Sequence, residues 1–206
     1  SREFLWFGTM DGLARYDGTE IRVFRHTAID PGSLSDNMVA AIAEDAQGNL
    51  WIATERGLDC WHRNTERFTH YRHDPEDSTS LSNDGITGVL VNPDGTLWVG
   101  TSGGGLNYLD PRQGKAERFI DWSRGQESRR HERIRTMYRD RQGKIWLGTD
   151  EGGLIEFDPA TRANRVYEYR ADDPFSLSHN RVNRIQEDRE GGLWVGTDGG
   201  LCRLDS

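Results

Sequence analysis

The sequence has little of what would specify a metal-binding, membrane-spanning or nucleic-acid-binding protein. Its 206 residues include only two cysteines, and no Cys-x-x-Cys pair or Cys/His cluster indicates zinc. No apolar run approaches the ~20 residues that cross a bilayer. A formal net charge of −8 argues against a surface for nucleic acid. We therefore expect no metal, no cofactor, no nucleic acid and no membrane segment in this chain.

Large apolar residues are also scarce. Leu, Ile, Val and Phe make up 41 of the 206 residues, which is close to the composition of disordered chains. Seven Trp and 24 Gly point the other way, because disordered segments are poor in aromatic residues. The composition predicts an ordered, turn-rich β protein whose core uses tryptophan where other proteins use leucine.

One pentapeptide occurs five times: an apolar residue, Trp, an apolar residue, a small residue and Thr. The copies occupy residues 5–9, 50–54, 97–101, 145–149 and 193–197. Their tryptophans, which we expect to be structural, lie 45 to 48 residues apart and are Trp6, Trp51, Trp98, Trp146 and Trp194. This regular spacing identifies the chain as a repeat protein.

The residues around each pentapeptide predict four short strands, a to d, with the pentapeptide as strand b. An Asp or Asn opens a tight turn before strand b, and Gly-Leu follows it, as expected for turns between paired strands. Four antiparallel strands per repeat form a blade of a β-propeller, and no segment has the apolar period of a helix. The units are 1–25, 38–73, 85–120, 134–170 and 182–206. The first lacks strand a and the last lacks strand d, so we expect eighteen strands, or about 4.5 to 5 blades.

The residue two after each tryptophan is always small. It is glycine in four copies and alanine in one: Gly8, Ala53, Gly100, Gly148 and Gly196. Glycine inside a strand marks a close approach of neighbouring atoms. We expect an aromatic ring, a tryptophan, to pack over this position.

Two motifs resemble a known family. The run Asp-x-x-Gly-x-apolar-Trp-apolar-Gly-Thr with Gly-Leu after it, as in 140–154 and 188–201, resembles the two-component regulator propeller repeat. Ser-Leu-Ser-x-Asn at 33–37 and 176–180 is also similar to that family. The resemblance implies an all-β propeller of about seven blades, of which this chain is a part. It also implies a periplasmic sensor region of a bacterial hybrid histidine kinase or diguanylate cyclase.

By this resemblance, the chain is a sensor module without catalytic residues that binds a small ligand, such as a carbohydrate fragment. It would relay binding to a kinase or cyclase output domain. Open blade edges favour self-association as a homodimer. Two alternatives stay open: a scaffold that dimerises without a ligand, and an enzyme like the lyases that some similar propellers form. The enzyme would need a general base such as His, which the recurring positions do not supply.

Strand polarity places the d-to-a loops and the b-to-c turns on one face, where loops on a rigid scaffold usually bind ligands. The candidate ligand-binding residues on that face are Asn37, Glu55, Arg56, Asp84, Arg133, Arg135, Asn180, Arg181 and Arg184. The other interpretation is that they are solvated loop ends.

Two further features lie outside the recurring pattern. The loop at 122–133 is basic in an acidic chain, so it is either a site for an anionic ligand or partner, or a tolerated insertion. Cys60 and Cys202 fall in strands c of blades that are not neighbours, so we expect free thiols.

Overall fold

The computed structural model describes residues 4–119 and 130–204. The chain divides into two compact units. The first comprises the described parts of residues 1–99 and 107–118, and the second comprises those of 100–106 and 119–206. Part of the basic loop predicted at 122–133 lies outside the described residues.

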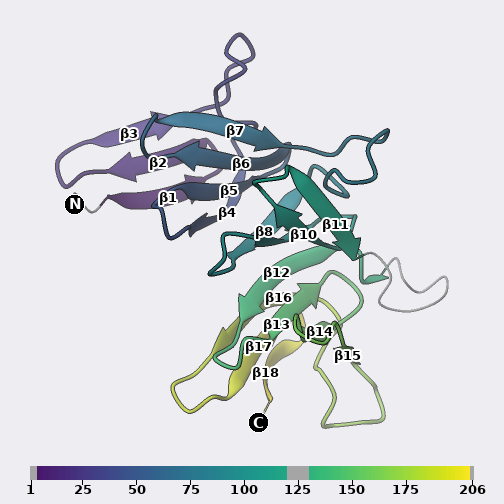
Figure 1. Ribbon diagram of the computed structural model, residues 1–206. Helices are drawn as coiled ribbons and strands as arrows, with labels where there is room; N and C mark the ends of the chain where they lie inside the picture. The colour runs from purple at the N-terminus through teal and green to yellow at the C-terminus, as the bar shows by residue number, and fades with distance from the viewer. Residues whose placement is uncertain (1–3, 120–129, 205–206) are drawn as a thin grey trace. The chain divides into compact units, whose positions relative to one another are not determined.

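All five sheets are antiparallel meanders in which strands neighbouring in sequence pair with each other (Figure 1). Three sheets have four strands, and the first and last have three. The first three sheets contain β1 (Leu5–Thr9), β2 (Gly12–Tyr16), β3 (Ile21–Phe24); β4 (Val39–Glu44), β5 (Leu50–Thr54), β6 (Gly57–His62), β7 (Arg67–Tyr71); and β8 (Ile86–Val91), β9 (Leu97–Thr101), β10 (Leu106–Asp110), β11 (Lys115–Phe119). The last two contain β12 (Ile134–Arg139), β13 (Ile145–Thr149), β14 (Leu154–Phe157), β15 (Asn164–Tyr167); and β16 (Val182–Glu187), β17 (Leu193–Thr197), β18 (Gly200–Leu204). Within residues 4–119 and 130–204, the all-β class, the four-stranded blade and the eighteen strands are confirmed.

The turn between strands a and b is built by one aspartate that does two things. Asp140 Oδ1 accepts the N–H groups of Gln142 and Lys144, each at 2.9 Å, as expected for a turn-opening residue. Its Oδ2 accepts the indole N–H of Trp146 at 2.8 Å. Asp188 holds Trp194 in the same way at 2.8 Å. The aspartate therefore joins the turn to the core tryptophan, a link that the sequence pattern does not reveal.

The hydrophobic cores lie between successive sheets within each unit. In the first unit, Leu13 of β2 packs with Val39 and Ile52 of the second sheet. In the second unit, Trp146 packs with Val182 and Val195 of the last sheet. Each sheet in these pairs contributes buried residues to the contact, which explains why strand b carries packing residues on two faces.

The tryptophan position is buried in the middle repeats and open in the last one. Trp51, Trp98 and Trp146 are at most 6% exposed, so their side chains belong to the hydrophobic core. Trp6 is half-buried, and Trp194 is 37% exposed. Trp194 lies in the three-stranded sheet β16–β17–β18, which lacks a strand d among the described residues.

The small residue after tryptophan faces the next sheet, but its neighbour is aliphatic. A Cβ atom added to Gly8 would lie 2.7 Å from Cγ1 of Val39, and one added to Gly148 would lie 2.6 Å from Cγ1 of Val182. Val39 and Val182 are each the first residue of the following strand a. The close approach is therefore confirmed, but the prediction of an aromatic ring is wrong. At Gly8 and Gly148, a branched aliphatic side chain of the next sheet projects into the space that the missing side chain leaves.

Cys60 and Cys202 are both free, as predicted. Cys60 is buried in β6, and burial raises the pKa of its thiol to about 12. This thiol is therefore an unreactive core residue.

Candidate functional site

The threonine that ends each pentapeptide builds the turn to strand c. Thr149 Oγ1 donates to the carbonyl of Gly153 at 2.9 Å and accepts the N–H of Gly152 at 2.8 Å. The N–H of the next residue, Asp150, donates to the carbonyl of Arg133 at 3.0 Å. The b-to-c turn is thereby fixed to the residue that precedes strand a of the same sheet. This arrangement confirms that these turns and the starts of strands a share one face.

The same construction in the last sheet places a second carboxylate. Thr197 Oγ1 donates to the carbonyl of Gly200 at 3.1 Å. The N–H of Asp198 donates to the carbonyl of Arg181 at 3.2 Å. In both sheets, an acidic residue after the threonine is held beside an arginine before strand a.

Three of the predicted arginines meet around these carboxylates in the second unit, and we call Arg133, Arg135, Arg181, Asp150 and Asp198 the arginine cluster. Arg135 Nη1 and Arg181 Nε lie 3.0 and 3.1 Å from Asp150 Oδ1, and Arg133 Nε lies 3.6 Å from Asp150 Oδ2. Arg181 Nη1 also lies 3.4 Å from Asp198 Oδ2. Arg181 therefore bridges the two carboxylates.

The arginine cluster carries more positive charge and more donors than its two carboxylates neutralise. Each guanidinium has five N–H donors, and four nitrogen atoms of the three arginines face the two carboxylates. Arg133 and Arg135 are exposed, and Asp150 is partly buried beneath them. A hydrogen bond from Asn183, at 2.7 Å, and the nearby Arg181 lower the pKa of Asp198. The guanidinium N–H groups that do not face these two carboxylates are of the kind that binds a carboxylate, a sulfate or sugar hydroxyls.

A buried histidine lies next to this cluster. His131 is 5% exposed, and neither of its ring nitrogens has a hydrogen-bond partner among the described residues. Its ring packs against the turn that carries Asp150, since a Cβ atom added to Gly152 would lie 2.3 Å from ring Cδ2. The ring is buried beneath the turn, so it supports the position of Asp150 and is not itself exposed to a ligand.

The predicted side chains Asn37, Asp84 and Asn180 are engaged in holding the long loops. Each uses its Oδ1 atom to accept a backbone N–H from the residue eleven positions earlier, at 2.7 Å. These bonds join the end of strand d to the start of the next strand a. The three residues therefore shape the d-to-a loops.

The remaining candidates lie outside the arginine cluster. Exposed Arg56 pairs with Asp36 at 3.3 Å, and Glu55 lies beside it on the b-to-c turn of the second sheet, in the first unit. Arg184 lies opposite Gly196 in the last sheet and is exposed. The sequence prediction missed Asp150 and Asp198. Their position, directly after the pentapeptide, is that of the candidate Glu55, and this was the available signal.

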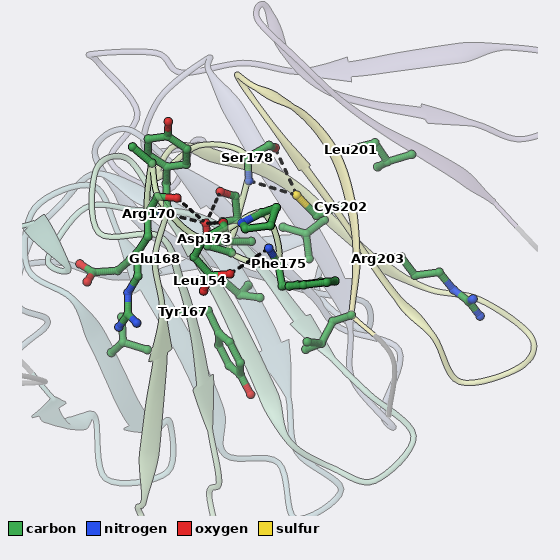
Figure 2. A pocket seen from close by; sticks show the side chains of 18 of the residues that line it. Leu154, Tyr167, Glu168, Arg170, Asp173, Phe175, Ser178, Leu201, Cys202 and Arg203 are labelled. Atoms are coloured by element: carbon green, nitrogen blue, oxygen red, sulfur yellow. Dashed lines mark hydrogen bonds between the residues drawn. The ribbon is translucent and has the colours of Figure 1, made fainter.

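A cavity of about 690 Å³ lies in the second unit between the end of β15, the loop after it, and β18 (Figure 2). Its walls include Leu201, which is 66% exposed. In three other sheets the equivalent leucine is at most 1% exposed and pairs with an aromatic residue of strand d: Leu13 with Phe24, Leu58 with Tyr71 and Leu154 with Tyr167. The cavity therefore lies along β18, an edge strand whose Leu201 has no covering strand d among the described residues. We do not assign it to a small ligand.

Residues 4–119 and 130–204 contain no group of three His, Cys, Asp or Glu side chains that could hold a metal ion. Within the same residues, no helix has the length and apolar character needed to cross a membrane.

Consecutive antiparallel meanders of three or four strands, each with a repeated tryptophan, define the chain as a β-propeller. Its sequence matches the family described as "Two component regulator propeller" at residues 33–56, 80–103, 128–151 and 176–199. The chain belongs to this family. No curated protein is significantly similar to it in sequence.

Solved structures agree with the fold. The extracellular domain of BT4673 from B. thetaiotaomicron, assigned to a hybrid two component system, has a TM-score of 0.77 and 25% identity over 98% of this chain and 28% of that one. The extracellular domain of BT3049 from the same organism, with the same assignment, has a TM-score of 0.67 and 23% identity over 98% and 32%. This chain thus spans about a third or less of those domains. Virginiamycin B lyase from Staphylococcus aureus shares the fold alone, because its sequence is only 12% identical. The match has a TM-score of 0.67 and covers 99% of this chain and 67% of the lyase.

Proposed function

We propose that this chain is part of a periplasmic sensor propeller that binds a small acidic carbohydrate fragment at the arginine cluster. The observation that carries the proposal is the excess of guanidinium N–H groups around Asp150 and Asp198 on the loop face. Membership in the two-component regulator propeller family supports the sensor role, and the extracellular location of the similar domains supports a place outside the cytoplasm.

Ligand binding would act on the two sheets that supply the cluster. Asp150 belongs to the turn after β13, and Arg181 precedes β16 of the next sheet. A ligand that binds better to one arrangement of these sheets shifts the population toward it, which is how a signal would reach a kinase or diguanylate cyclase output domain.

Isothermal calorimetry and thermal shift with an acidic disaccharide that contains a uronic acid, and with its neutral analogue, test the proposal. At 100 times its Kd, a ligand stabilises the folded protein by ~2.7 kcal/mol. Arg135→Gln should weaken binding of the acidic disaccharide at least tenfold, because it removes a charged donor pair. Arg56→Gln, an exposed arginine of the first unit, is the matched control and should bind normally.

Two results would contradict the proposal. If acidic and neutral sugars bind equally and Arg135→Gln changes neither, the arginine cluster is not the site. If no sugar binds and the protein associates with rising concentration, the scaffold function is favoured.

A further inference from the structure

The loop between the first and second sheets is held by a buried network in the first unit. Ser35 lies in the loop, Asp59 lies in β6, and both side chains are buried. Asp59 Oδ2 accepts the Ser35 N–H at 2.6 Å, and Asp59 Oδ1 accepts the Ser35 hydroxyl at 2.6 Å. We call this pair, together with His70 of β7, the Asp59 clasp.

His70 links the Asp59 clasp to a second point of the loop. Its Nδ1 atom lies 2.6 Å from Asp59 Oδ1, and its Nε2 atom lies 2.9 Å from the carbonyl oxygen of Pro31. A carboxylate and a carbonyl oxygen only accept hydrogen bonds, so the ring must donate from both nitrogens. Only the positively charged imidazolium form has two N–H donors.

The charged groups around His70 favour this form. Asp59 faces the ring from β6, and its hydrogen bond is the main cause that raises the pKa of His70. Arg72, beyond the end of β7, opposes this effect through its charge, and its Nη2 donates to Ser35 Oγ at 3.1 Å. The nearest charge is the buried carboxylate, so protonation of His70 compensates a charge that would otherwise be costly.

Two other loops have the same clasp built from different chemistry. In the third sheet, Asn107 Oδ1 accepts the Ser82 N–H at 2.9 Å, and Asn107 Nδ2 donates to Ser82 Oγ at 2.8 Å. In the last sheet, the Cys202 thiol lies 3.2 Å from both the N–H and the hydroxyl of Ser178 (Figure 2). The amide clasp does not titrate. The Ser82 amide, held by Asn107, is therefore an internal control for the pH dependence of the Ser35 amide.

We propose that the Asp59 clasp is a pH-sensitive latch on the loop at 26–37, closed when His70 is protonated. The neutral ring has one N–H. If that N–H stays with Asp59, the Nε2 lone pair faces the Pro31 carbonyl oxygen at 2.9 Å, and the two repel. The loop then separates from β7 at Pro31. The loop carries Asp36, the partner of Arg56, so opening changes the position of a charged pair on the loop face.

Hydrogen exchange on the whole chain between about pH 6 and 9, corrected for intrinsic rates, tests the latch, with the ¹⁵N signals of His70 recorded in parallel. We expect both ring nitrogens of His70 to be protonated at the lower pH. Protection of the Ser35 amide should fall about tenfold as the ring deprotonates, which corresponds to the loss of one hydrogen bond. Protection of the Ser82 amide should stay constant over the same range.

Two variants locate the effect. Asp59→Asn copies the third sheet, so it should keep the serine bonds and remove the difference between the Ser35 and Ser82 amides. His70→Gln should leave Ser35 with protection that does not vary with pH. The proposal is overturned if His70 carries one proton while the loop is protected, or if Ser35 protection is constant through its titration. The wild-type titration decides this even where a variant fails to fold.

Discussion

The contact between glycine and valine in neighbouring sheets leads to a sharp prediction about stability. Gly148 and Gly196 occupy the same position of the repeat, two residues after tryptophan. A Cβ atom at Gly148 would lie 2.6 Å from Val182 Cγ1 and 2.6 Å from Thr136 Cγ2, well inside the 3.4 Å at which ordinary contacts begin. The nearest atom to a Cβ at Gly196 is 3.8 Å away. The two glycines therefore share a position in the repeat but differ in burial and in the atoms around them.

We expect Gly148→Ala to lower the free energy of unfolding by ~1–3 kcal/mol, the usual cost of overpacking. For a chain of this size, that corresponds to a fall in Tm of about 2–12 °C. Gly196→Ala should be neutral or stabilising by ~0.4–1 kcal/mol, because alanine restricts the unfolded chain. Urea unfolding followed by circular dichroism, with differential scanning calorimetry, measures both.

A double-mutant cycle identifies the neighbour. Val182→Ala shortens the side chain that meets Gly148, so Gly148→Ala should cost at least ~0.5 kcal/mol less in that background. Equal losses for Gly148→Ala and Gly196→Ala, or strict additivity with Val182→Ala, would refute the packing described here.

Two further predictions concern the sheet edge and pH. Leu154→Ala should lower the free energy of unfolding by ~2–5 kcal/mol because the side chain is buried, whereas Leu201→Ala should change it by no more than ~0.5 kcal/mol. Urea unfolding midpoints measure both variants. Equal losses would mean that the β18 edge is covered. The hydrogen bond to Asp59 raises the pKa of His70 in the folded protein. Protonated His70 therefore contributes its full stabilisation below about pH 6.5, the pKa of histidine in the unfolded chain, and this stabilisation is lost as the pH rises through the raised pKa of the folded protein. Unfolding at constant ionic strength should show this loss in the wild type and not in His70→Gln, and identical pH profiles would contradict it.

The arginine cluster shows how a repeat protein acquires an individual site. Every pentapeptide ends in threonine, so every repeat makes a similar b-to-c turn. The residue after that threonine varies, being Met10, Glu55, Ser102, Asp150 and Asp198. Only two neighbouring sheets of the second unit place Asp there with Arg before strand a. The scaffold is therefore shared, while the charges differ from repeat to repeat.

The strands and turns could be read from the sequence because their causes are local. Alternation within five residues specifies a strand, and Asp with Gly a few residues apart specifies the turn. The spacing of the five tryptophans identified the repeat, and the four strands expected in each repeat predicted the blade. The family was inferred from the resemblance of the motifs at 140–154, 188–201, 33–37 and 176–180 to its repeat. Asn37, Asp84 and Asn180 were predicted as candidate ligand-binding residues, and their hydrogen bonds to the residues that follow strands d were not foreseen.

Tertiary structure alone decided which side chains meet between sheets. Val182 against Gly148, and Asp150 against Arg181, join residues that are more than thirty positions apart. The clasp of Ser35 by Asp59 and His70 spans up to 35 positions. The repeat makes many residues equivalent in sequence, so the pattern cannot tell which neighbour fills a glycine or which carboxylate receives an arginine. Packing of one sheet on the next makes that choice, because it sets the distances over which hydrogen bonds and ion pairs act.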